Sequence, residues 1–149
     1  MLQRIDQDRI RELIPHAGAM CLLDRVEAWD ATRIRCRSDS HQRGDNPLRH
    51  AGRLRAICGV EYAAQAMALH GALCAGGRPR AGLLVSLRDV ICAVAELDEE
   101  PGELIVEAER LLGDEDRMIY AFRLHSAERE LLRGRATVVL DAAPVRAAS

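Results

Sequence analysis

Apolar and polar residues alternate along several short segments of the chain, and this pattern predicts β-strands. The clearest case is residues 31–38, a half-buried strand whose outer face carries Arg33, Arg35 and Arg37. Residues 117–126 alternate as strongly and predict a second strand of the same kind. Further strands are expected at 83–94, as one long strand or a bent pair, at 103–112 and at 131–140.

Two other segments have the pattern of helices. Residues 6–14 form a short amphipathic pattern that Asp6 can cap and Pro15 stops. Residues 56–74 are apolar on nearly every side, which is typical of a helix buried all round. The order is a short helix, a strand pair, one buried helix and about four consecutive strands. It favours an antiparallel sheet packed on the buried helix, an α+β fold.

Composition narrows the classes of function. The chain has 149 residues, 48% of them hydrophobic, which fits a single domain over residues 1–149 with 141–149 as a frayed tail. The formal charge of −2 and 3% aromatic residues argue against a nucleic-acid binder. All 21 basic residues are arginine, so no lysine can form a Schiff base. No apolar run is long enough for a membrane span and no secretory signal is visible, so we expect a cytoplasmic protein.

The five cysteines are far apart and form no CxxC pair. We therefore expect neither a metal site nor a disulfide framework, and we expect most of the cysteines to be small buried residues. Nothing in the sequence points to a cofactor.

Three stretches resemble the 3-hydroxyacyl-[acyl-carrier-protein] dehydratases. Residues 13–26, LIPHAGAMCLLDRV, resemble that family's (I/L)PH…(L/V)DRV segment, and residues 59–66, GVEYAAQA, resemble its central-helix segment. Residues 82–88 resemble the strand that follows. The closer likeness is to the smaller dehydratase-like branch of aryl-polyene and related fatty-acid-type gene clusters, over roughly residues 10–140. The resemblance implies a hot-dog fold, an antiparallel sheet wrapped around one long central helix.

The resemblance also implies a site. His16 matches the Pro-His motif and would be the catalytic acid/base, and Glu61 would be the carboxylate that orients the leaving hydroxyl. Dehydration removes a proton from Cα and delivers one to the departing hydroxyl, and an imidazole can do both in turn. Gly59 would let the thioester carbonyl approach the helix N-terminus, and Gln65 would bind Glu61 or substrate. For Gln65 a purely structural bond to a loop is an equal alternative.

One departure concerns the histidine. The better-known dehydratases carry it in an HFPG loop about fourteen residues before the helix glutamate, and this sequence has no such motif near Pro47. His50 lies in the corresponding loop and is the second candidate for the acid/base.

These residues leave three functions open. The first is dehydration of a 3-hydroxyacyl thioester on acyl carrier protein, by a homodimer or a heterodimer with a related hot-dog subunit, since the family's two catalytic residues come from different protomers. The others are a non-catalytic subunit that pairs with an active dehydratase, and an acyl thioesterase. The arginines of residues 31–38, together with Arg49, Arg53 and Arg55, could contact an acidic carrier protein or form ordinary solvated faces.

Overall fold

The structure is a computed structural model that describes residues 4–14, 20–78, 82–114 and 116–140. The expected tail at 141–149 lies outside these ranges. The elements in chain order are α1 (Gln7–Leu13), β1 (Arg25–Trp29), β2 (Arg33–Ser38), the short 3₁₀ helices η2 (Ser40–Gln42) and η3 (Ala56–Cys58), α2 (Gly59–Cys74), β3 (Gly82–Cys92), β4 (Leu104–Gly113), β5 (Arg117–His125) and β6 (Glu130–Leu140).

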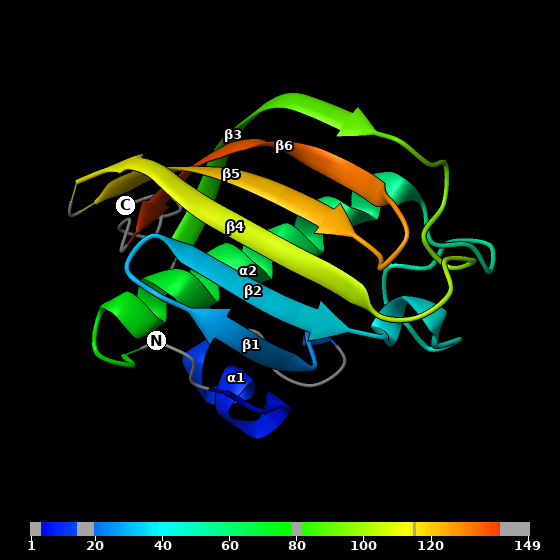
Figure 1. Cartoon of the computed structure of the whole chain (residues 1–149), viewed down its shortest axis with the longest axis horizontal. Helices are drawn as coiled ribbons and strands as arrows, with labels where there is room; N and C mark the ends of the chain where they lie inside the picture. Colours follow the sequence, from blue (N-terminus) through cyan, green and yellow to red (C-terminus); the bar gives the residue numbers. More distant parts are fainter. Residues whose placement is uncertain (1–3, 15–19, 79–81, 115, 141–149) are drawn as a thin grey trace, which may run out of the picture.

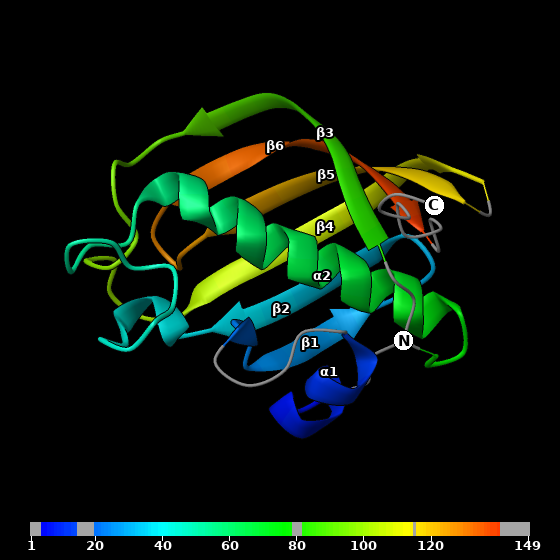
Figure 2. The same cartoon turned by 180° about the vertical axis from the view of Figure 1, so that it is seen from behind.

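The six strands form one antiparallel sheet in the order β1-β2-β4-β5-β6-β3. The sheet curves around α2, which lies along its concave face, and α1 packs beside β1 at the far edge (Figure 1, Figure 2). No helix among the described residues is long and apolar enough to cross a membrane. The α+β arrangement expected from the sequence is confirmed.

The alternation along each strand separates an inner from an outer face. On β5 the predicted inner residues Met118, Tyr120, Phe122 and Leu124 are all buried. They pack in the same core as the apolar residues of α2. Burial of apolar area at roughly 25 cal/mol per Å² is the main force that holds the sheet on the helix.

The outer face of β2 is paired with glutamates. Arg33 and Arg35 lie opposite Glu109 and Glu107 of β4, with N···O distances of 2.7 and 3.0 Å, and Arg37 contacts Glu27 of β1 at 3.0 Å. Each of these charges therefore has a partner within the sheet, and contact of this face with a carrier protein stays a prediction.

The predicted first helix has the expected start. The Asp6 carboxylate accepts a hydrogen bond from the backbone N–H of Arg9 at 3.1 Å, which caps α1. Ile10 and Leu13 are fully buried and attach the helix to the core.

The expectation that most cysteines are buried is wrong. Cys21 and Cys36 are buried, Cys58 is half-buried, and Cys74 and Cys92 are exposed. Cys74 ends α2 and Cys92 ends the edge strand β3, so an apolar sequence neighbourhood did not distinguish a core position from an element's end.

Gly134 of β6 lies directly under an aromatic ring of the core. A Cβ atom at Gly134 would lie 2.8 Å from Phe122 Cζ and 3.0 Å from Val90 Cγ2. Since overpacking a core typically costs 1–3 kcal/mol, we expect Gly134→Ala to lower the free energy of unfolding by about that amount in a denaturant titration. Gly44→Ala is the matched control, because no atom lies within 4 Å of its Cβ position. Equal stability of the two variants would contradict this view of the core.

Candidate active site

Glu61 lies in the first turn of α2 and is exposed, on the side of the helix that the sheet does not cover. It makes no hydrogen bond or ion pair with another described residue. Its neighbour one turn earlier, Ile57, is 54% exposed, so an apolar surface lies beside the carboxylate. The start of the helix also favours a negative charge. An accessible carboxylate in this position can accept a hydrogen bond from a substrate hydroxyl.

Gln65, one turn beyond Glu61, is buried and faces a loop. Its side-chain oxygen accepts a hydrogen bond from the Leu22 backbone N–H at 2.9 Å, and its amide nitrogen donates to the Met20 carbonyl. The amide is thus engaged by residues 20–22, the structural alternative left open by the sequence. Its contact with substrate or Glu61 stays a prediction.

Tyr62, the residue after Glu61, also connects the helix to a loop. Its buried hydroxyl lies 2.7 Å from the Ser40 hydroxyl and accepts from the Asn46 amide at 2.9 Å. The Ser38 and Ser40 hydroxyls in turn donate to the Leu22 carbonyl at 2.5 and 2.7 Å. Two loops, one before β1 and one after β2, are therefore tied to one turn of α2.

This polar cluster was missed by the sequence analysis. A tyrosine within an apolar helix does signal that its hydroxyl needs a partner. The pattern of residues does not say which of the many polar residues in 38–53 supplies that partner, because the contact depends on the tertiary packing of the loop.

Gly59 is buried, and it faces the sheet. A Cβ atom there would lie 2.7 Å from Leu132 Cδ2 and 3.0 Å from Leu124 Cδ2. The backbone N–H of Gly59 donates into the preceding 3₁₀ turn, and that of Cys58 donates to the Arg55 carbonyl at 3.0 Å. The absence of a side chain at Gly59 therefore lets the sheet pack closely on the helix. A role of Gly59 in binding a thioester carbonyl stays a prediction.

The structure describes only one of the two candidate histidines. His16 lies outside the described residues. His50 is exposed and forms a tight turn with Arg53, whose central residues Ala51 and Gly52 have φ values of 52° and 77°. The His50 imidazole makes no hydrogen bond with a described residue, and no contact joins it to Glu61.

A hollow of about 790 Å³ lies elsewhere, on the outer face of the sheet. Outward side chains of β2, β4, β5 and β6 line it, among them Arg33, Glu107, Arg123 and Arg133. Glu61 is not among the lining residues, and the sheet separates this hollow from α2. The hollow is therefore distinct from the candidate active site.

Comparison with protein families identifies the chain. Residues 8–146 match the model of the ApeP-like family, described as the ApeP dehydratase. The chain belongs to the ApeP-like dehydratase family. This match covers both the Pro-His segment and the central helix with Glu61, which are the stretches that carried the resemblance in the sequence. No curated protein sequence matches the chain significantly.

Solved structures confirm the hot-dog fold of this ApeP-like protein. The dehydratase heterocomplex ApeI:P from Xenorhabdus doucetiae is similar with a TM-score of 0.76 and 22% identity, over 91% of this chain and 90% of that chain. Zebra fish thioesterase superfamily member 2 has a TM-score of 0.64 and 12% identity, over 91% and 95%. A mutant of the thioesterase PA1618 from Pseudomonas aeruginosa has a TM-score of 0.54 and 17% identity, over 78% and 79%. At these identities the likeness concerns the fold alone.

His70 lies in the last turns of α2 and is fully buried, with both ring nitrogens bonded. Nε2 lies 2.9 Å from the Asp30 carbonyl, which only accepts, so this nitrogen carries the proton. Burial lowers the pKa of His70 from its usual 6.5, which favours the neutral ring in the folded chain. In that neutral form Nδ1 carries no proton and accepts from the Tyr120 hydroxyl at 2.7 Å.

This arrangement predicts a loss of stability in mild acid. A histidine whose pKa is lower in the folded than in the unfolded chain stabilises the fold fully above the unfolded pKa of about 6.5, and that stability is lost as the pH falls through the lowered pKa. We expect the free energy of unfolding to decrease between about pH 7 and pH 5.5. His70→Gln should reduce this decrease. An identical pH dependence in His70→Gln would contradict the prediction.

Proposed function

We propose that this ApeP-like protein takes part in the dehydration of a 3-hydroxyacyl thioester carried on acyl carrier protein, in a fatty-acid or polyene-type pathway. The observation that carries the proposal is an exposed Glu61, with no hydrogen bond or ion pair to another described residue, in the first turn of the central helix of an ApeP-like dehydratase. In the reaction a base takes the Cα proton, the Cβ hydroxyl leaves with a proton as water, and the trans-2-enoyl double bond forms.

Each site residue has a proposed role in this reaction. Glu61 holds and orients the leaving hydroxyl. His16 is the acid/base, and His50 is the alternative. Gln65 and Gly59 shape the substrate side of the helix start, Gln65 by fixing residues 20–22 beside it.

The protein is proposed to act as one subunit of a hot-dog dimer. Strand β3 pairs with β6 on one side only, and its other side carries no strand among the described residues. Exposed aliphatic residues lie along it, Leu83, Val85 and Leu87 among them. A long apolar edge strand is a template for pairing with another chain. The similar ApeI:P structure is itself a dehydratase heterocomplex, which supports pairing with a related hot-dog subunit.

The non-catalytic subunit is the second candidate. It is favoured by His50, because a general acid/base is normally oriented by a hydrogen bond, and this imidazole has none with a described residue. In that case the chain contributes only a pairing surface, and the catalytic residues belong to the active hot-dog partner.

The experiment is an assay of the purified chain, alone and with a related hot-dog subunit, on a 3-hydroxyacyl carrier thioester. Formation of the enoyl thioester supports dehydration. Release of free thiol indicates a thioesterase. No turnover in either combination contradicts the enzymatic proposal.

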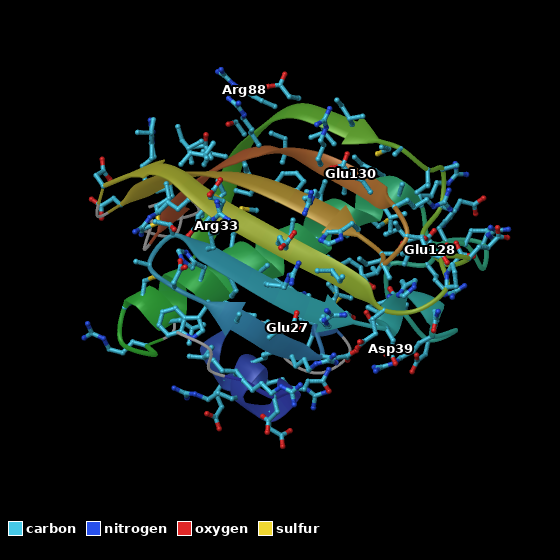
Figure 3. The ribbon with its side chains drawn as sticks, viewed as in Figure 1. Glu27, Arg33, Asp39, Arg88, Glu128 and Glu130 are labelled. Carbon is cyan, nitrogen blue, oxygen red and sulfur yellow. The ribbon has the colours of Figure 1, made fainter. Side chains whose placement is uncertain are left out.

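Glu61→Gln tests the carboxylate directly. It keeps shape and hydrogen-bonding capacity, and since the side chain is exposed the variant should fold with unchanged stability. We expect the dehydration rate to fall at least about a hundredfold, the scale of a positioned acid/base group. Glu128→Gln, an exposed carboxylate in the β5–β6 turn, is the control and should keep full activity (Figure 3). Full activity of Glu61→Gln would exclude the role.

The same assay separates the two histidines. If His16 is the acid/base, His16→Asn should be as damaging as Glu61→Gln while His50→Asn is tolerated. The reverse result would assign the role to His50. Tolerance of both substitutions in a complex that remains active would place the acid/base on the partner subunit.

A further inference from the structure

The outer face of the sheet has two halves with different charge patterns. Toward β2, arginines lie opposite glutamates, as Arg33 does opposite Glu109. Toward the free edge, arginines lie opposite arginines: Arg88 of β3 is in register with Arg135 of β6. Like charges directly opposite each other on one face are destabilising, so this pair needs a reason outside the chain's own stability.

The second row of this half repeats the pattern. Arg133 of β6 lies opposite Arg123 of β5. Arg123 reaches Glu107 at 2.8 Å and Arg133 reaches Glu130 at 3.7 Å. Both cations of this inner row thus have an acidic partner.

The pair at the edge has none. Among the described residues, neither Arg88 nor Arg135 has a carboxylate within ion-pair distance, and the β5 neighbour of Arg135 is Ala121. Asp89 follows Arg88 in the chain but lies in an irregularity of β3 with φ of 55°, and it forms no ion pair with Arg88. Both arginines are exposed, and Arg88 projects from the outermost strand (Figure 3). Among the described residues, two arginines without an ion pair therefore lie in register at the edge where another strand would add, with the exposed Asp89 next to Arg88 on the same strand.

We infer that Arg88 and Arg135 select the partner of β3: they disfavour a second copy of this chain and favour a related hot-dog subunit whose edge strand presents a carboxylate opposite Arg88. This inference rests on the edge-strand pairing in the proposed function. Two antiparallel copies of β3 related by a twofold axis near Leu87, the middle of the strand, place both Arg88 side chains on the outer face as diagonal neighbours. Diagonal positions are within reach of long side chains.

Self-pairing would therefore gather four guanidinium groups, Arg88 and Arg135 of each copy, on the adjoining β3 and β6 strands of the two copies, none of them in an ion pair with a described residue. The exposed aliphatic residues of β3 favour pairing but do not discriminate between partners. The charge provides the discrimination, since a carboxylate on the partner strand turns the repulsion into an ion pair.

Arg88→Gln tests the repulsion. We expect this neutral variant to self-associate about threefold or more strongly than the wild type in sedimentation equilibrium at low ionic strength. The difference should shrink at high salt, which screens exposed charges. Arg4→Gln is the matched control: Arg4 is an exposed arginine at the opposite, β1 edge, and its removal should change nothing.

Arg88→Glu tests the attraction. An equal mixture of this variant with the wild type should contain more dimer than either protein alone at the same total concentration, and a mixture of wild type with Arg4→Glu should not. If the amount of dimer does not change with the charge at position 88, partner selection by Arg88 is wrong, but pairing through the β3 edge is not contradicted. Samples that stay monomeric in every combination overturn both the selection and the edge pairing, while the Glu61→Gln assay still decides the reaction.

Discussion

The burial of α2 against the concave face of the sheet is the constraint on which the rest of the structure depends. The helix is apolar on almost every side, so its position is set by how much of it the curved sheet can cover. Its buried polar side chains restrict it further, because each unsatisfied polar atom would be costly in the core. Gln65, Tyr62 and His70 each have partners on different loops or strands, which leaves one rotation of the helix and places Glu61 on the uncovered side.

The same bonds couple the site to its loops. Gln65 holds residues 20–22, and Tyr62 holds Ser40 and Asn46. These two loops adjoin the segments that contain the two candidate histidines in sequence. The helix therefore positions the Glu61 carboxylate and also fixes residues 20–22, Ser40 and Asn46 relative to it. A substitution at Gln65 or Tyr62 would disturb geometry around Glu61 without touching a reacting atom.

Periodicity predicted the elements well, because it reports burial along a single segment. The alternation of residues 117–126 correctly predicted the inner face of β5, and the apolar run at 56–74 predicted the segment that forms η3 and α2. Strand order and the partners of Gln65 and Tyr62 could not be predicted in this way, since they depend on which segments meet in space. The motif makes Glu61 a candidate, and its exposure depends on the packing of the helix, which the motif does not show.

The uncovered side of α2 and the free edge of β3 both fit a protein that acts with a partner subunit. The sheet of six strands ends in exposed aliphatic residues, and the candidate carboxylate Glu61 is exposed, so the described residues leave both surfaces uncovered. Natural edge strands are usually protected by charge, and here the charge is a mid-strand arginine opposite a second arginine. Such an edge resists its own copy while remaining open to a complementary one. Partner choice and site completion would then be decided by the same strand.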